Sequence, residues 1–316
     1  MKKTIILFGV SFLLFFFVTN CKTTKQIAFI PKAPATTGNV KELTRVTDDP
    51  VAEFYPDISP DGTKLLCHVR DDNKTGGERF SIVLINLGSP GRTPLVGAYT
   101  NTPSWYPDSK TFVYQYSKPG KPIVARSSIE SAGITYISTN PMGETDERPK
   151  VSHNGKKIAF DTGIGGSDKV CMMDVTGMNF TILTDGVNPC WSSDETTIVY
   201  QKDVGNFTHL FLYNLQTGQS TQITSGDNNN LKARFSPDGK MLVFESDRDK
   251  DAYHIYVMKS DGTAITQLTQ GKSSEGNPCW ASDGYIYFQS NAGAPNTANG
   301  IWSYSDIWKL KPNLIL

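Results

Sequence analysis

Six stretches of the sequence follow one pattern, and this internal repetition constrains the fold more than any other feature. Each stretch has an apolar or aromatic residue, a tight polar turn and then a run rich in apolar residues. The turns are centred on Asp61, Asp108, Asn154, Asp194, Asp238 and Asp283, at intervals of 47, 46, 40, 44 and 45 residues. A period of this length suits about four short strands in each unit, as in the blades of a propeller. The repetition therefore predicts an all-β fold of six blades.

The turns have a clear physical basis, which the sequence Ser-Pro-Asp-Gly at residues 59–62 and 236–239 illustrates. Proline sets the φ angle, aspartate bonds to its own backbone and glycine accepts a positive φ. The turn carboxylates thus have a structural explanation, although such a series resembles catalytic acids. The residue before each turn is expected in the core between blades; the set is Ile58, Trp105, Val151, Trp191, Phe235 and Trp280.

The ends of the repeat array predict how the ring closes. Third strands are expected at 81–87, 133–139, 170–175, 210–215, 254–258 and 307–310. Fourth strands are expected at 93–96, 181–184, 221–224 and 265–269, whereas the second repeat shows none between 139 and 148. The last unit ends after three strands, and an unassigned segment at 42–47 (ELTRVT) resembles the fourth strands. We expect this N-terminal strand to complete the last blade, because closure removes an exposed sheet edge.

Residues 232–269, KARFSPDGKMLVFESDRDKDAYHIYVMKSDGTAITQLT, resemble the repeat of the TolB-like propeller family throughout, and residues 277–291 resemble its first half. The resemblance covers about residues 41–312 and implies a six-bladed β-propeller. It also implies binding of protein partners, as in the periplasmic members of the family, and we expect no enzyme activity. Some related propellers carry an N-terminal α/β domain or a hydrolase domain. We expect this chain to be a stand-alone member.

The first residues have the features of an export signal. Two lysines precede an uncharged apolar run from 5 to 18, which is shorter than the roughly 20 residues of a membrane span. Cys21 follows in the sequence Val-Thr-Asn-Cys, which resembles a bacterial lipobox. We predict a lipoprotein signal peptide over 1–20, lipid attachment at Cys21, a tether over 21–40 and a tail over 313–316. The lipid would hold the protein on a membrane, and Lys22 favours the outer membrane, facing the periplasm or the cell surface.

Composition and motifs exclude several classes of function. The formal net charge is zero, with 31 basic and 31 acidic residues, so no basic field exists to bind nucleic acid. No Gly-x-Ser-x-Gly nucleophile elbow is present. The four histidines form no zinc motif and are assigned to different blades and different repeat positions, so we expect no metal site and no cofactor. Unpaired, space-filling roles are expected for Cys67, Cys171, Cys190 and Cys279.

The sequence also indicates where a partner would bind. In propellers the loops of all blades converge at the mouth of the central channel, and the residue six positions before each turn residue is expected there. These candidate partner-binding residues are Tyr55, Thr102, Arg148, Asn188, Lys232 and Asn277. Equivalent positions with different side chains suit a surface adapted to one ligand, although unconstrained loop residues would also vary.

We therefore predict a monomeric envelope lipoprotein that binds a protein or peptide at its channel mouth. Two alternatives stay open. One is a lactonase- or hydrolase-like propeller enzyme with a metal ion in the channel, and the other is a surface-exposed adhesin.

Overall fold

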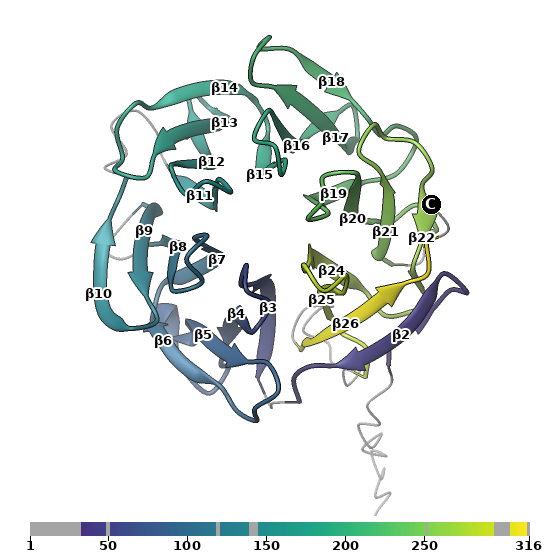
Figure 1. Cartoon of the computed structure of the whole chain (residues 1–316), viewed down its shortest axis with the longest axis horizontal. Helices are drawn as coiled ribbons and strands as arrows, with labels where there is room; N and C mark the ends of the chain where they lie inside the picture. The colour runs from purple at the N-terminus through teal and green to yellow at the C-terminus, as the bar shows by residue number, and fades with distance from the viewer. Residues whose placement is uncertain are drawn as a thin grey trace, which may run out of the picture.

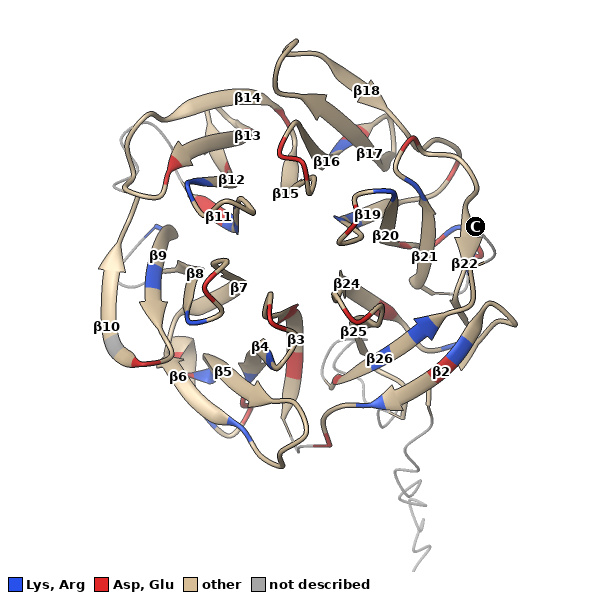
Figure 2. Cartoon of the chain, viewed as in Figure 1, with Lys and Arg blue, Asp and Glu red and all other residues tan. Residues whose placement is uncertain are grey.

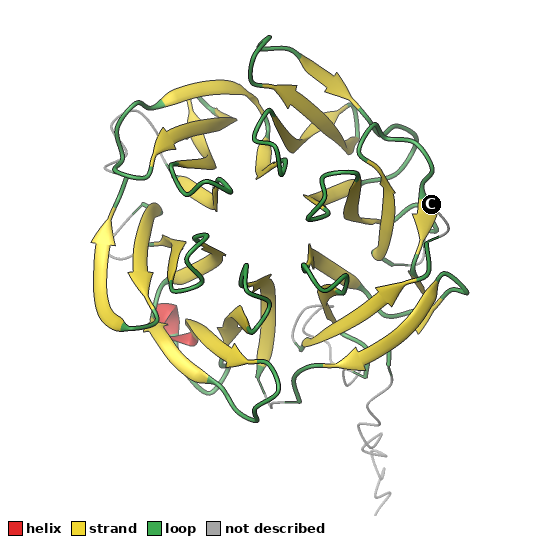
Figure 3. Cartoon of the chain, in the orientation of Figure 1, coloured by secondary structure: helices red, strands yellow, loops and turns green. Residues whose placement is uncertain are grey.

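The computed structural model describes residues 33–48, 51–117, 121–138, 145–250, 252–293 and 304–314. In this part of the chain, six four-stranded antiparallel sheets are arranged as blades around a central channel (Figure 1). Apart from one short 3-10 helix, η1 (Gly76–Arg79), the described elements are strands joined by loops (Figure 3). The predicted all-β propeller of six blades is confirmed.

The first strand of each blade lies next to the channel, and later strands lie further out (Figure 1). Blades one to three consist of β3 (Ala52–Ile58), β4 (Lys64–Arg70), β5 (Phe80–Asn86), β6 (Thr93–Gly97); β7 (Thr100–Trp105), β8 (Thr111–Tyr116), β9 (Ile123–Ser128), β10 (Ser131–Tyr136); and β11 (Asp146–Val151), β12 (Lys157–Ile164), β13 (Ser167–Asp174), β14 (Thr181–Asp185). Blades four to six consist of β15 (Val187–Trp191), β16 (Thr197–Val204), β17 (Phe207–Asn214), β18 (Ser220–Gln222); β19 (Asn230–Phe235), β20 (Met241–Ser246), β21 (His254–Lys259), β22 (Thr266–Gln267); and β24 (Glu275–Trp280), β25 (Ile286–Ser290), β26 (Asp306–Pro312), β2 (Val40–Arg45).

Each blade buries apolar side chains against both of its neighbours. In β4, Leu65, Cys67 and Val69 pack against blade six, whereas Leu66 packs against blade two. Successive side chains of a strand point to opposite faces, so a strand that is buried on both sides is an unbroken apolar run. One such cluster lies between every pair of adjacent blades.

The tryptophans that share a repeat position belong to these interfaces. Trp105 Nε1 donates a hydrogen bond to the Asp57 carbonyl, and Trp191 Nε1 donates one to the Lys150 carbonyl, both at 2.9 Å. In each case the acceptor is on the inner strand of the preceding blade, and the indole is buried. Trp280 is half-buried and packs on the cluster between blades five and six. The predicted core role of this position is confirmed.

The described cysteines fill space in the same clusters. Cys67 and Cys279 lie in the cluster between blades one and six, Cys171 lies in the cluster between blades two and three, and Cys190 is half-buried. All four are free thiols. Burial raises the pKa of Cys171 and of Cys279 to about 12, which keeps both thiols protonated and unreactive.

The turns between the first two strands of a blade are fixed by their own side chains. Ser59 Oγ donates to Asp61 Oδ1 at 2.6 Å, and the Lys64 backbone N–H donates to Ser59 Oγ at 2.9 Å. Ser236 and Asp238 form the same arrangement in blade five. Acidic residues therefore mark these turns near the channel (Figure 2). The structural explanation of the turn carboxylates is confirmed.

Blade two departs from the sequence prediction. The stretch predicted as its third strand, 133–139, overlaps the fourth strand β10, and the third strand is β9. The sequence of β9, Ile-Val-Ala-Arg-Ser-Ser, ends in polar residues, so its apolar pattern is weak. Tertiary contacts fix the position of β9 instead. The strand pairs with β8 along its length, and Ser127 Oγ lies 3.1 Å from the Tyr114 hydroxyl. In blade five the predicted fourth strand is split into β22 and β23 (Thr269–Gln270).

The N-terminal strand β2 closes the ring, as predicted. It pairs with β26 in antiparallel register, with Leu43 opposite Leu310. Arg45 Nη2 lies 2.7 Å from Asp306 Oδ2, and that carboxylate is buried. The Ile307 backbone N–H donates to Thr47 Oγ1 at 2.9 Å. Backbone pairing, an ion pair and a side-chain hydrogen bond therefore join the two ends of the ring.

The segment before β2 is held on the fifth blade. Residues 33–40 belong to the predicted tether, and within them β1 (Ala35–Thr36) pairs with β23. Thr37 Oγ1 also donates to the Gln267 carbonyl at 2.8 Å. The predicted signal peptide, Cys21 and the first part of the tether lie outside the described residues, as do the last two residues of the predicted tail. No helix in the described ranges is long and apolar enough to span a membrane.

The closing ion pair leads to the first prediction. Arg45→Ala removes the cation that faces the buried Asp306 carboxylate, so we expect the free energy of unfolding to fall by about 3 kcal/mol. The matched control is Lys110→Ala, which removes the ion pair with Glu130 on the exposed surface of blade two and should leave stability unchanged. Chemical denaturation of both variants provides the measurement. Equal stability of Arg45→Ala and the wild type would show that the pair does not hold the closure.

Candidate functional site

The inner strand of every blade contains a β-bulge at the same position. The register between the first two strands shifts there, for instance between Phe54 and Asp57 in blade one and between Gly276 and Cys279 in blade six. One residue of each bulge has a left-handed backbone conformation: Tyr55 (φ 51°), Thr102 (44°), Arg148 (50°), Asn188 (55°), Lys232 (54°) and Asn277 (50°). These are the six residues predicted from the repeat, and we call them the channel ring.

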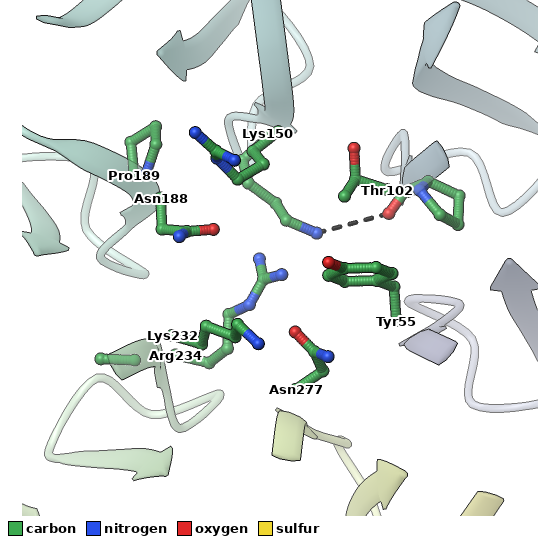
Figure 4. A pocket seen from close by; sticks show the side chains of 11 residues that line it. Tyr55, Thr102, Lys150, Asn188, Pro189, Lys232, Arg234 and Asn277 are labelled. Carbon is green, nitrogen blue, oxygen red and sulfur yellow. Dashed lines mark hydrogen bonds between the residues drawn. The ribbon is translucent and has the colours of Figure 1, made fainter. Parts of the chain in front are cut away.

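The channel ring lines one cavity in the central channel. Its other lining residues are Pro103, Lys150, Pro189, Ala233 and Arg234 (Figure 4). The cavity has a volume of about 20 Å³, which is room for about one water molecule. The structure therefore brings all six predicted residues together, while their role in partner binding stays a prediction.

A second ring of polar side chains supports the bulges. The Lys232 backbone N–H donates to Gln201 Oε1 at 2.8 Å, and the Asn277 backbone N–H donates to Glu245 Oε2 at 2.7 Å. Each acceptor belongs to the second strand of the preceding blade. The acceptors and their equivalents form what we call the supporting ring: His68, Gln115, Asp161, Gln201, Glu245 and Gln289, all buried. Sequence reasoning missed this ring, although its first five members each stand seven residues after the turn residue.

The supporting ring also holds two cations of the channel ring. Arg148 donates from Nε and Nη2 to Asp161 at 2.9 and 2.6 Å. Lys232 Nζ lies 3.2 Å from Glu245 Oε1. Burial opposes the charge on both cations, but the facing carboxylates outweigh it and raise the pKa of Arg148 and of Lys232. Both side chains therefore stay charged, with their counter-ions on the side away from the channel axis.

Two further cations of the cavity were not identified from the sequence. Lys150 Nζ lies 3.1 Å from Asp57 Oδ1 and donates to the Pro103 carbonyl at 3.4 Å. Arg234 reaches toward the middle of the cavity, and the described part of the chain gives it no hydrogen-bond or ion-pair partner (Figure 4). Burial and then the nearby Arg234 lower the pKa of Lys150. Both residues stand two positions after a channel-ring residue, and this regularity could have revealed them.

Two of the four histidines contact the neighbouring blade. The assignment of the four histidines to different repeat positions is wrong for these two, because His209 and His254 occupy equivalent places in β17 and β21. His209 Nδ1 lies 3.2 Å from Asn230 Nδ2, and His254 Nδ1 lies 2.8 Å from Glu275 Oε2, each partner being the first residue of the next blade. Neither histidine lines the cavity. Across the described ranges, no three His, Cys, Asp or Glu side chains lie close enough to hold a metal ion.

Comparison with known families agrees with the fold. The family described as TolB beta propeller domain matches residues 35–206 and 186–298. A Bacillus subtilis protein named Uncharacterized peptidase YuxL is 30% identical over 116 residues, which is 35% of this chain and 18% of that protein. The chain therefore matches less than a fifth of that relative's length.

Solved structures with the same fold include TolB proteins and enzymes alike. TolB from Acinetobacter baumannii has a TM-score of 0.62 at 15% identity, over 80% of this chain and 64% of that chain. A gluconolactonase from Xanthomonas campestris has a TM-score of 0.63 at 13% identity, over 89% of this chain and 95% of that chain. At these identities the likeness shows a shared fold and no shared activity.

The left-handed backbone of the channel ring leads to a prediction about stability. A β-branched residue is strained at positive φ, whereas asparagine tolerates it. Thr102→Asn should therefore stabilise the fold by about 1 kcal/mol, and the reciprocal Asn188→Thr should destabilise it by a similar amount. Thermal unfolding of the two variants tests the argument. Shifts of the same sign in both would mean that backbone strain does not govern these positions.

His68 leads to a prediction about pH. The imidazole is packed among Phe54, Tyr55 and Phe80, neither ring nitrogen has a partner within the described residues, and burial, with Arg70 nearby, lowers its pKa to about 3. The neutral ring contributes stability above the ordinary pKa of about 6.5, and this stability is lost as the pH falls toward about 3.

We test this with His68→Gln, which places at this position the residue that the supporting ring has in three other blades. The wild type should lose stability more steeply than the variant between pH 6 and pH 4, by at most about 1.4 kcal/mol per pH unit. The exposed His153→Gln is the control and should keep the wild-type slope. Denaturant titrations at several pH values give the slopes, and parallel curves for wild type and His68→Gln would contradict the assignment.

Proposed function

This chain belongs to the TolB beta propeller domain family, and from that premise we propose that it is a binding module of the bacterial cell envelope. In this proposal a protein or peptide segment inserts at the channel ring and contacts several blades at once. The protein is a scaffold, not an enzyme, and a lipid on Cys21 anchors it to the outer membrane.

The observation that carries the proposal is the contrast between backbone and side chains in the channel ring. All six positions share one left-handed conformation, yet they hold five kinds of side chain. Positions that serve folding hold similar residue types in several blades, as the turn residues and the tryptophans do. Six fixed positions with different side chains present an asymmetric surface, which suits one segment in one orientation.

In this arrangement a lipid anchor would not obstruct the central channel. The described chain begins beside the outer strand of blade five and enters the ring through β2, at the outer edge of blade six (Figure 1). A lipid attached upstream of that point would hold the ring by its rim and leave the channel free for a ligand. Whether the ring faces the periplasm or the cell surface separates a periplasmic scaffold from an adhesin, and protease treatment of intact cells distinguishes the two.

The channel residues give little support to a metal-dependent enzyme. The cavity is lined by two lysines, two arginines, two asparagines and uncharged residues, with no carboxylate or histidine among them. Ammonium and guanidinium groups repel a divalent cation and cannot act as its ligands. This lining supports a binding role for the channel over a metal-dependent reaction there.

Site-specific crosslinking in the native envelope tests the proposal. A photoreactive phenylalanine analogue replaces Tyr55 in the channel ring or, as the control, Ile182 on the outer strand of blade three, which is exposed. We expect one dominant protein adduct from position 55 and none of that mass from position 182. The same adducts from both positions, or none from position 55, would rule out a partner at the channel.

A further inference from the structure

We propose that the segment bound at the channel ring presents a carboxylate, which lies between Arg234 and Lys150 in the cavity. This inference rests on the proposed function and adds the chemical class of the ligand. The group is the side chain of an aspartate or glutamate, or the C-terminal carboxylate of the partner. Either source offers the same two oxygen acceptors.

The lining of the cavity has one sign of charge. Arg148 and Lys150 contribute side chains from blade three, Lys232 and Arg234 contribute side chains from blade five, and no Asp or Glu belongs to the lining. Asp161 and Glu245, which balance Arg148 and Lys232, are in the supporting ring behind these cations. Asp57, which pairs with Lys150, is on the inner strand of blade one at the repeat position that Lys150 and Arg234 hold in their blades. Four cations therefore converge here, and Arg234 is the one without a paired carboxylate among the described residues.

Arg234 is the residue that most requires an acceptor. It is half-buried and reaches between Lys150 and Lys232, while the described residues offer it no acceptor (Figure 4). A guanidinium has five N–H donors in a planar fork, which match the two oxygens of a carboxylate. Arginine is for this reason the residue type best suited to bind a carboxylate in a partly dry site.

Lys150 provides the second contact. Its ammonium group has three donors, of which Asp57 and the Pro103 carbonyl occupy two. The side chain is 10% exposed and lies near the like charge of Arg234. A carboxylate between the two cations would supply the third acceptor and replace their mutual repulsion with attraction.

The size of the cavity limits what can enter. With room for about one water molecule, it accepts the end of a side chain or of a chain, and a folded domain must stay at the channel mouth. Asn188 of blade four and Asn277 of blade six also line the cavity (Figure 4). Asn277 Nδ2 donates to Gln289 Oε1 at 2.7 Å, which leaves the Asn277 side-chain carbonyl and the Asn188 amide to bond to the backbone of an extended segment.

Binding of three short peptides to the full-length protein in detergent tests the inference. Ac-Ala-Ala-Glu-Ala-Ala-NH2 carries a side-chain carboxylate, Ac-Ala-Ala-Ala-Ala-Ala-OH carries a C-terminal one, and Ac-Ala-Ala-Gln-Ala-Ala-NH2 carries none. We expect at least one of the two carboxylate peptides to bind about tenfold more tightly than the glutamine peptide, with an affinity that falls as salt rises. The peptide that binds better identifies the source of the carboxylate. Calorimetric titration measures the affinities.

Variants of the cavity make the test specific. Arg234→Gln should abolish the tenfold preference, and Arg234→Lys should restore part of it, because lysine keeps the charge but not the fork. The control, Lys110→Gln, changes an exposed cation that does not line the cavity and should bind as the wild type. Thermal unfolding confirms that each variant is folded. Equal affinities for the three peptides, or an unchanged preference in Arg234→Gln, would overturn the inference.

A failure of the carboxylate inference can be distinguished from a failure of the proposed function. If the crosslink from position 55 forms as strongly with Arg234→Gln as with the native arginine, a partner binds at the channel but not through a carboxylate. If that crosslink is absent while the carboxylate peptides bind, the cavity is an anion site without a protein partner.

Discussion

The pairing of β2 with β26 is the contact that makes the other features of the molecule possible. Every blade is apolar on both faces, so each needs two neighbours, and a chain of blades without closure would expose one face at each end. The cluster between blades one and six, which contains Tyr287 and Ile307, forms only when the last blade meets the first. Closure also directs all six inner strands toward one axis, and without it the bulges would not surround a common cavity.

The bulges convert this ring into a recognition surface. A bulge turns one residue of each inner strand toward the axis and leaves its backbone N–H outside the ladder of its own blade. A buried N–H needs an acceptor, and in four of the six bulges the supporting ring supplies one across the blade interface, whereas the Thr102 N–H bonds to Asn101 Oδ1. The same acceptors serve a second purpose where they are carboxylates, because Asp161 and Glu245 hold the cations of the channel ring. The hydrogen bonds to the bulge N–H groups and the ion pairs of the channel cations therefore depend on one set of side chains.

Repetition made the fold predictable, and its limits explain what was missed. Six copies of one pattern predict the blades, the closing strand, the core tryptophans and the positions of the channel ring, because each copy confirms the others. Where a single copy is irregular, as in β9, the polar end of the strand gives no apolar pattern, and pairing with β8 and β10 fixes the strand. Lys150 and Arg234 escaped notice for a related reason. Their repeat position holds serine or cysteine in three other blades and an aspartate, Asp57, in blade one, so the position has no single sign of charge, and the convergence of the two cations depends on the closed ring.

The arrangement of charge also explains how a protein with no net charge can select an anion. The cations of the cavity face the axis, and most of their counter-ions lie a few ångströms further out, so the field at the axis is positive while the whole molecule stays neutral. Such a field decays within about 8 Å at physiological salt, so it neither attracts a distant ligand nor accelerates encounter. It acts on a group that has already entered the cavity, where desolvation strengthens each contact. Selection at this site therefore depends on the fit and charge of one inserted group, and the complex should differ from its weaker competitors chiefly in the rate at which it dissociates.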